Sequence, residues 1–155
     1  MRNRTKALLV VLVVAIAGVW PAQAQTKTNV SGTWKMNRAK SKFAEGGPEA
    51  ITIKFEQQDA SIHEWLTIGG TQGERTLEFT YKTDGSQNAA QVEGRDIKTM
   101  AKWEGDSLLV VLTEGNGGTF SRKFTMADGG KTMTIAVRQT GPNGDKDDTV
   151  LLEKQ

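Results

Sequence analysis

The segment Ser31-Gly32-Thr33-Trp34-Lys35-Met36-Asn37 begins the part of the chain that we expect to fold. A glycine permits a tight entry into a strand, and the tryptophan that follows is large enough to anchor a small core. Burying an indole removes more apolar surface from water than burying any other side chain. We therefore expect Trp34 to lie buried in the first strand, with the rest of the sheet built around it.

The residues before this segment have the three parts of a secretory signal peptide. Met1 to Lys6 is basic, Ala7 to Val19 is continuously apolar or small, and Ala22-Gln23-Ala24 resembles a cleavage site. The apolar run is shorter than the roughly 20 residues that cross a bilayer as a helix. We predict cleavage after residue 24, a mature chain that begins at Gln25, and export to the periplasm or the extracellular space.

The charge and the cysteine content restrict the partners of the mature chain. Removing residues 1–24 removes three basic residues and no acid, so the net charge changes from +2 to −1. Such a chain has no net basic field to attract nucleic acid or anionic lipid. The sequence contains no cysteine, which excludes disulfides and a lipidated N-terminal cysteine. No later stretch is long and apolar enough to span a membrane. We expect a polar lead-in over residues 25–31 and one domain over 32–155.

From Ala50 onward, apolar residues recur at every second position, which is typical of half-buried strands. After the first strand near Gly32–Asn37, the pattern predicts strands near 51–56, 62–68, 74–83, 97–104, 107–113, 119–126, 132–139 and 147–153. We expect the residues from Asp84 to Gln91 to form a polar loop. Arg38 to Glu49 can hold at most one or two helical turns, because Gly46-Gly47-Pro48 interrupts it.

Short connections between consecutive strands favour antiparallel neighbours. A meander of about nine strands leaves two exposed edges unless the sheet closes on itself. We therefore predict an all-β fold, an antiparallel up-and-down β-barrel of about 8–10 strands with little helix. A two-sheet sandwich is the alternative, although its crossovers usually need longer connections.

The sequence resembles the lipocalin and fatty-acid-binding-protein superfamily, the calycins. The Gly32–Lys35 segment resembles their first strand. Ser31–Asn37, Lys40–Phe43 and Trp103–Asp106 resemble segments of small secreted bacterial lipocalin-like proteins. In lipocalins the motif tryptophan packs at the closed end of the barrel under a basic residue from a late strand. The resemblance implies these roles for Trp34, after Gly32, and for Arg138.

Two departures separate the chain from fatty-acid-binding proteins. Those proteins carry two helices after the first strand, and the segment from Arg38 to Ala50 is too short for them. They also end in a segment whose Arg and Tyr hold the fatty-acid carboxylate. The matching positions here are Val150 and Leu152, so the resemblance does not imply that device.

Few residues support catalysis or metal binding, and we expect no cofactor and no metal. His63 is the only histidine and the sequence has no cysteine, which together exclude a Cys–His pair and a multi-histidine site. It shares a strand face with Trp65, and we expect that face to point outward. The oxygen-rich segment from Asn143 to Asp148 lacks the sixth-position glycine of a calcium loop, so we interpret it as a hairpin turn.

Strand periodicity directs Arg122 into the barrel, because it lies between Phe120 and Phe124 on the same face. A buried guanidinium keeps its charge and needs a partner. Glu64 has inward parity unless a bulge shifts it. If an acid faces Arg122, the pair is structural; if none does, Arg122 can bind an anionic or carbonyl head group.

We predict the second outcome, with Arg75 and Tyr81 as helpers, although Arg75 can equally reach solvent at its strand end. Trp103, beside the small Thr99 and Ala101, either lines a ligand site or seals the core. The candidate ligand-binding residues are Arg122, Arg75, Tyr81, Phe79, Phe120, Phe124 and Trp103.

The leading functional hypothesis is an exported protein that binds a small hydrophobic or amphiphilic molecule inside the barrel. The alternative is a cell-envelope interaction protein with a filled barrel and functional surface loops, whose protein partner the sequence does not identify. An enzyme has the least support, because no Gly-x-Ser-x-Gly elbow accompanies His63.

Overall fold

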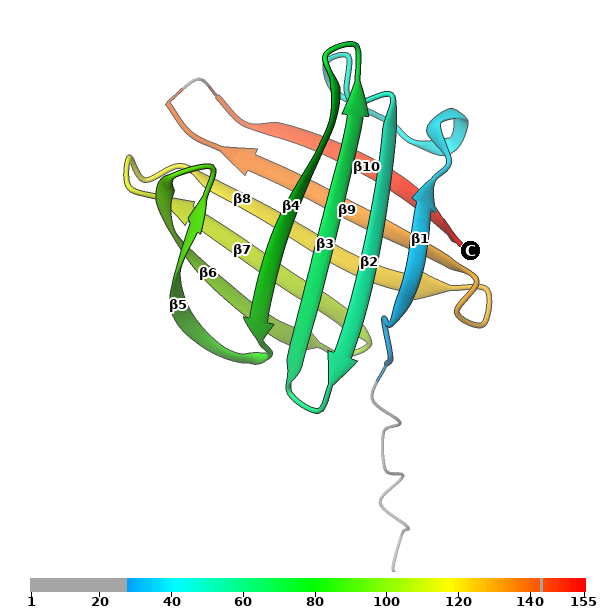
Figure 1. Cartoon of the computed structure of the whole chain (residues 1–155), viewed down its shortest axis with the longest axis horizontal. Helices are drawn as coiled ribbons and strands as arrows, with labels where there is room; N and C mark the ends of the chain where they lie inside the picture. The colour runs from blue at the N-terminus through cyan, green and yellow to red at the C-terminus, as the bar shows by residue number, and fades with distance from the viewer. Residues whose placement is uncertain (1–27, 143) are drawn as a thin grey trace, which may run out of the picture.

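The computed structural model describes residues 28–142 and 144–155, so the predicted signal peptide lies outside the described residues. The described chain contains ten strands and one short 3-10 helix (Figure 1). The elements are β1 (Gly32–Met36), η1 (Arg38–Lys40), β2 (Ala50–Gln58), β3 (Ser61–Gly70), β4 (Gly73–Lys82), β5 (Asp84–Val92), β6 (Arg95–Glu104), β7 (Ser107–Glu114), β8 (Thr119–Ala127), β9 (Thr132–Thr140) and β10 (Lys146–Lys154).

All ten strands belong to one antiparallel sheet with the order β4-β3-β2-β1-β10-β9-β8-β7-β6-β5. Pairing of β1 with β10 joins the first strand of the sequence to the last. β4 and β5, the two ends of this order, are not joined by a ladder, so the barrel is nearly closed with one gap. In Figure 1, β2, β3 and β4 cross in front of β7 to β10 at a large angle. The predicted all-β, up-and-down barrel is confirmed.

The predicted loop from Asp84 to Gln91 is wrong, because these residues form β5. β5 pairs with β6 from Asp84 to Val92, with a register shift between Asp84 and Gln87. Ala90 and Val92 pack against the core, while most of the other side chains are exposed polar groups. Backbone pairing with β6 thus holds a segment whose side chains bury little apolar surface.

Trp34 closes one end of the barrel, as expected. Its side chain is fully buried, and its Nε1 donates a 2.9 Å hydrogen bond to the Val30 carbonyl. Val30 is buried as well, and its amide donates to Gln57 Oε1 at 3.0 Å. The described part of the lead-in therefore covers the closed end. The basic residue over the indole is Lys154, whose Nζ lies 5.2 Å from the ring centroid.

The role implied for Arg138 is therefore wrong. Arg138 lies exposed on β9 and forms ion pairs with Asp145 at 2.9 Å and Asp147 at 3.4 Å. The superfamily pattern indicated a basic residue from a late strand, and β10 supplies it in place of β9.

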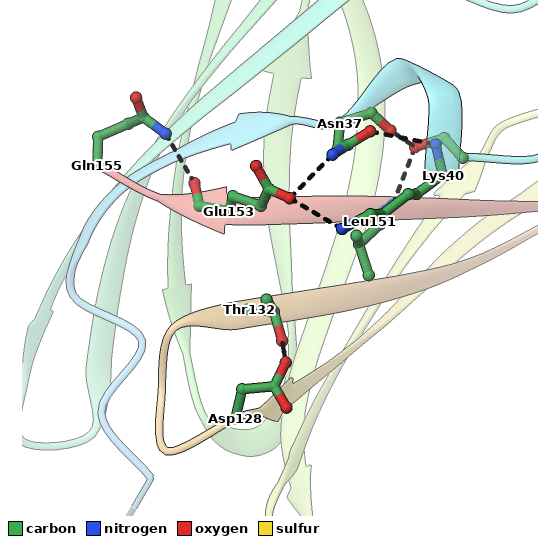
Figure 2. Close-up of polar contacts among 8 residues, drawn as sticks. Asn37, Lys40, Asp128, Thr132, Leu151, Glu153 and Gln155 are labelled. Carbon is green, nitrogen blue, oxygen red and sulfur yellow. Dashed lines mark hydrogen bonds and ion pairs between the residues drawn. The ribbon is translucent and has the colours of Figure 1, made fainter.

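The connection from β1 to β2 has η1 as its one regular element, and hydrogen bonds join it to β10 (Figure 2). Asn37 accepts a hydrogen bond from the Lys40 amide at 3.2 Å, and its Nδ2 donates to Glu153 Oε1 at 2.8 Å. Lys42 and Thr149 form an isolated bridge farther along. Residues 37–49, all of which the structure describes, therefore do not form the two helices that fatty-acid-binding proteins carry after their first strand.

Candidate ligand site in the open end of the barrel

On five of the strands, inward-facing side chains change from buried to partly exposed toward the open end. On β3, Ile62 and Glu64 are 0% exposed, whereas Leu66 and Ile68 are only half-buried. β4, β7, β8 and β9 repeat this gradient, with buried and then partly exposed residues at Tyr81 and Leu77, Val110 and Leu112, Phe124 and Phe120, and Ile135 and Val137. The closed half of the barrel is therefore packed, and the open half exposes apolar side chains.

These partly exposed side chains line an interior cavity. One part has a volume of about 400 Å³ and a second part about 250 Å³. The two parts share five lining residues, namely Leu66, Ile68, Arg75, Phe120 and Arg122. Most of the remaining walls are aliphatic or aromatic, supplied by Phe43, Ile51, Ile53, Leu77, Phe79, Val92, Ile97, Leu112, Ile135 and Val137. Such a mostly apolar concavity with a few polar groups is typical of small-molecule sites.

Arg122, Glu64 and Tyr81 form a closed hydrogen-bonded triad at the level where the packed half ends. Arg122 Nη1 donates to Glu64 Oε1 at 2.6 Å, and Nη2 donates to Glu64 Oε2 at 2.8 Å. Tyr81 Oη accepts from Arg122 Nη2 at 2.8 Å and donates to Glu64 Oε2 at 2.8 Å. The guanidinium lies between the Phe79 and Phe124 rings, at 5.6 and 5.2 Å from their centroids. The bidentate geometry gives both direction and strength to the pair.

The expectation that no acid faces Arg122 is therefore wrong. Arg122 is 3% exposed and Glu64 is 0% exposed, so the ion pair is buried. Burial lowers the pKa of Arg122, but the adjacent Glu64 carboxylate and Tyr81 more than offset this effect and keep the pKa above its usual value. Burial also raises the pKa of Tyr81 well above its ordinary value. The triad thus carries one positive and one negative charge and a neutral phenol.

The mouth of the cavity carries ion pairs rather than isolated charges. Arg75 on β4 pairs with Glu93 at 3.1 Å, across the gap that separates β4 from β5. Arg95 on β6 lies 3.8 Å from Glu93 and 3.6 Å from Glu114. Arg75, expected to point inward or to reach solvent, is exposed at this rim and also lines the cavity.

The structure brings only some of the predicted ligand residues together. Phe79, Phe120 and Arg122 line the cavity, and Phe120 is 36% exposed. Tyr81 lies beneath in the triad, and Phe124 packs edge-on against Phe55 with centroids 5.4 Å apart. Trp103 is the second-last residue of β6, at the closed end of the barrel, where it packs against the core. The structure therefore does not support the assignment of Trp103 to the ligand site. It supports the alternative, in which Trp103 packs in the core.

Other aliphatic cavity residues and the rim groups Glu93 and Arg95 were not predicted as site residues. Inward parity gave a signal for Leu66, Leu77 and Leu112, as it did for Glu64. It could not separate residues of the packed half from those of the open half, because that depends on the distance of each residue from the ends of the barrel.

Two other features remain outside this site. His63 lies on the outer face, as expected, stacked on Trp65 at 3.8 Å and paired with Glu78 at 2.6 Å. A wider, more open depression of about 770 Å³ shares Ile97 and Glu114 with the cavity mouth, and exposed strand residues form much of its wall. Within residues 28–142 and 144–155, no group of acidic or histidine residues has the arrangement of a metal site, and no helix is long and apolar enough to cross a membrane.

No protein-family model matches the chain, and no curated protein matches it in sequence. Several solved structures match its fold. Secretory abundant heat soluble protein 4 from Ramazzottius varieornatus aligns with a TM-score of 0.61 at 13% identity, over 84% of this chain and 97% of the other. A Schistosoma mansoni fatty acid binding protein in complex with arachidonic acid aligns with a TM-score of 0.58 at 14% identity, over 83% and 98%.

Caenorhabditis elegans lipid binding protein 8 aligns with a TM-score of 0.55 at 10% identity, over 81% of this chain and 94% of the other. These identities are too low to carry individual functional residues from one chain to another, but the alignments cover almost the whole barrel. Together with the strand order, they show that this chain shares the β-barrel fold of these proteins.

Proposed function

We propose that the protein binds a small hydrophobic or amphiphilic molecule in the open half of its barrel. The observation that carries this proposal is the gradient of burial along the strands, from a packed closed half to half-buried apolar side chains around an interior cavity. Apolar surface left in contact with water inside a concavity is available for transfer to a ligand. The alternative hypothesis expects a barrel filled with side chains, and only the closed half of this barrel is packed in that way.

The low-identity neighbours add support at the level of the fold. One of them was solved with arachidonic acid, and another is named as a lipid binding protein. This fold is therefore able to hold lipids, but the ligand of this chain must be argued from its own cavity.

Cavity filling tests the proposal with a matched control on the same strand. Leu112 points into the cavity, whereas Leu109 is half-buried on the outer face of β7. We expect Leu112→Trp to weaken binding of the neutral, polarity-sensitive dye Nile red by tenfold or more, because the indole occupies ligand space. Leu109→Trp should leave the affinity unchanged. Equal affinity in both variants, or no dye binding by the parent protein, contradicts the proposal.

We further propose that the protein acts after export, as the sequence before Gln25 suggests. One native mass spectrum of the secreted protein tests this proposal and also searches for a natural ligand. The bare mass should correspond to a chain that begins at Gln25, and a reproducible adduct would be the ligand. A secreted chain that retains residues 1–24 contradicts the predicted cleavage.

A further inference from the structure

Every guanidinium that lines the cavity already has a carboxylate partner. Arg75 pairs with Glu93, Arg95 lies between Glu93 and Glu114, and Arg122 pairs with Glu64. Asp148 adds another acid to the lining. The three guanidinium groups of the lining therefore face at least as many carboxylates, and the described walls offer no excess positive charge.

Arg122 nevertheless keeps an unused donor. Its terminal nitrogens are bonded to Glu64 and Tyr81, but its buried Nε has no hydrogen-bond partner among the described residues. A buried N–H without an acceptor costs free energy, and an oxygen from a bound molecule can satisfy it. Arg122 lines both parts of the cavity, and a ligand oxygen reaches its buried Nε once a neighbouring side chain shifts slightly.

The charge of the polar end of the ligand follows from these two observations. A carboxylate placed beside Arg122 would lie close to Glu64 and would be a third, uncompensated charge in a poorly hydrated site. A hydroxyl, ester or ketone oxygen accepts the same hydrogen bond without adding charge. Resting on the proposed function, we infer that the preferred ligand is a neutral amphiphile whose acceptor oxygen binds Arg122 Nε–H, rather than a fatty-acid anion.

A competition experiment with ligands of equal chain length tests this inference on the unmodified mature protein. Methyl dodecanoate, 1-dodecanol and dodecanoate are compared as competitors of Nile red at pH 8, where the acid is ionised. We expect the ester and the alcohol to bind at least tenfold more tightly than the carboxylate. A carboxylate that binds equally well or more tightly overturns the inference while leaving the proposed function intact. Failure of Nile red and all three lipids to bind overturns both.

Replacing Glu64 then tests the cause of the preference. Glu64→Gln removes the carboxylate but leaves the guanidinium, so we expect the preference to shift toward dodecanoate by tenfold or more. Glu78→Gln is the matched control, because Glu78 is an acid on the outer face of β4 that is hydrogen-bonded to His63. It should leave the ligand ranking unchanged. An unchanged ranking in folded Glu64→Gln protein contradicts the inference.

A second measurement does not depend on the stability of that variant. The infrared carbonyl band of methyl dodecanoate bound to the parent protein should lie at lower frequency than in hexane, because Nε–H donates to it. The double variant Glu64→Leu/Arg122→Met removes the charged pair together, and the band should return toward its position in hexane. A band that is the same in both proteins contradicts the contact with Arg122.

Discussion

At the scale of single residues, burying the Glu64–Arg122 pair has a large desolvation free energy, and removing one of its members destabilises the fold. Transferring each charge out of water costs several kcal/mol, and the bidentate Arg122–Glu64 contact offsets this only together with the hydrogen bonds that Tyr81 makes to both residues. Removing one partner leaves a buried charge, whereas removing both leaves only the Tyr81 hydroxyl as a buried polar group. The pair therefore fixes how the two crossing halves of the barrel meet, since Glu64 lies on β3 and Arg122 on β8.

A second residue-scale feature is the backbone of Gly32, which has a φ of +129°. A Cβ at this position would lie 2.8 Å from Lys154 Cε, and the flexible lysine can move away from it. The backbone conformation itself is unfavourable for alanine, and we expect Gly32→Ala to lower the free energy of unfolding by about 1–3 kcal/mol.

Urea denaturation measures the Gly32→Ala effect, with Gly70→Ala as the control. Gly70 has no positive φ, and a Cβ there meets nothing within 4 Å. Its substitution should change stability by less than about 0.5 kcal/mol. Equal effects of the two substitutions would show that the Gly32 conformation is not maintained in solution.

Residue-level prediction from the sequence succeeded where it depended on local geometry. The two-residue period placed Arg122 and Glu64 inward, and both are inward. It could not show that they meet, because they are 58 positions apart and on strands that are not neighbours in the sheet. Likewise, the choice of Lys154 rather than Arg138 to cover Trp34 depends on where β9 and β10 end relative to the closed end of the barrel.

At the scale of elements, β5 shows why one strand was missed. Asp84-Gly85-Ser86-Gln87-Asn88 contains turn-forming and polar residues, and only Ala90 and Val92 contribute to the core. Intrinsic preference therefore indicated a loop. Pairing with β6 overrides that preference, and this information lies in β6 and in the closure of the barrel rather than in β5.

β5 should also be less protected from hydrogen exchange than a strand that is paired on both edges. It pairs with β6 on one edge, whereas its other edge faces the gap next to β4. β8 pairs with β7 and β9 on both edges. We expect β5 amides to exchange with deuterium on the order of tenfold or more faster than β8 amides, because fewer hydrogen bonds must open. Peptide-level exchange mass spectrometry measures this difference, and equal protection would show that the gap is bridged by hydrogen bonds in solution.

At the scale of the whole molecule, exposed acids link several parts of the barrel to basic or hydrogen-bonding partners. Glu45 pairs with Lys146, Glu104 with Lys102 and Lys123, and Glu153 with Asn37 and Lys40. The hydrogen bond from Lys146 lowers the pKa of Glu45, and that from Lys102 lowers the pKa of Glu104. The hydrogen bond from Asn37 lowers the pKa of Glu153.

These directions determine how stability should depend on pH. An acid whose pKa is lower in the folded than in the unfolded chain stabilises the fold at a pH above its unfolded value, here about 4.5. That stabilisation is lost as the pH falls through the folded pKa. We therefore expect the thermal midpoint to be nearly constant from pH 7 to about pH 5 and to fall at lower pH.

Salt and one substitution separate this mechanism from general acid unfolding. The pairs are exposed, so 1 M NaCl should lower their contribution at neutral pH and flatten the decline in acid. Glu153→Gln should lower the midpoint at pH 7 and reduce its dependence on pH below 5, because Glu153 connects β10 to Asn37 and Lys40 (Figure 2). Glu49→Gln is the control, since the Glu49 side chain is exposed and makes no ion pair with the described residues. A midpoint that rises on acidification, or the same pH dependence in Glu153→Gln and the parent, contradicts this mechanism.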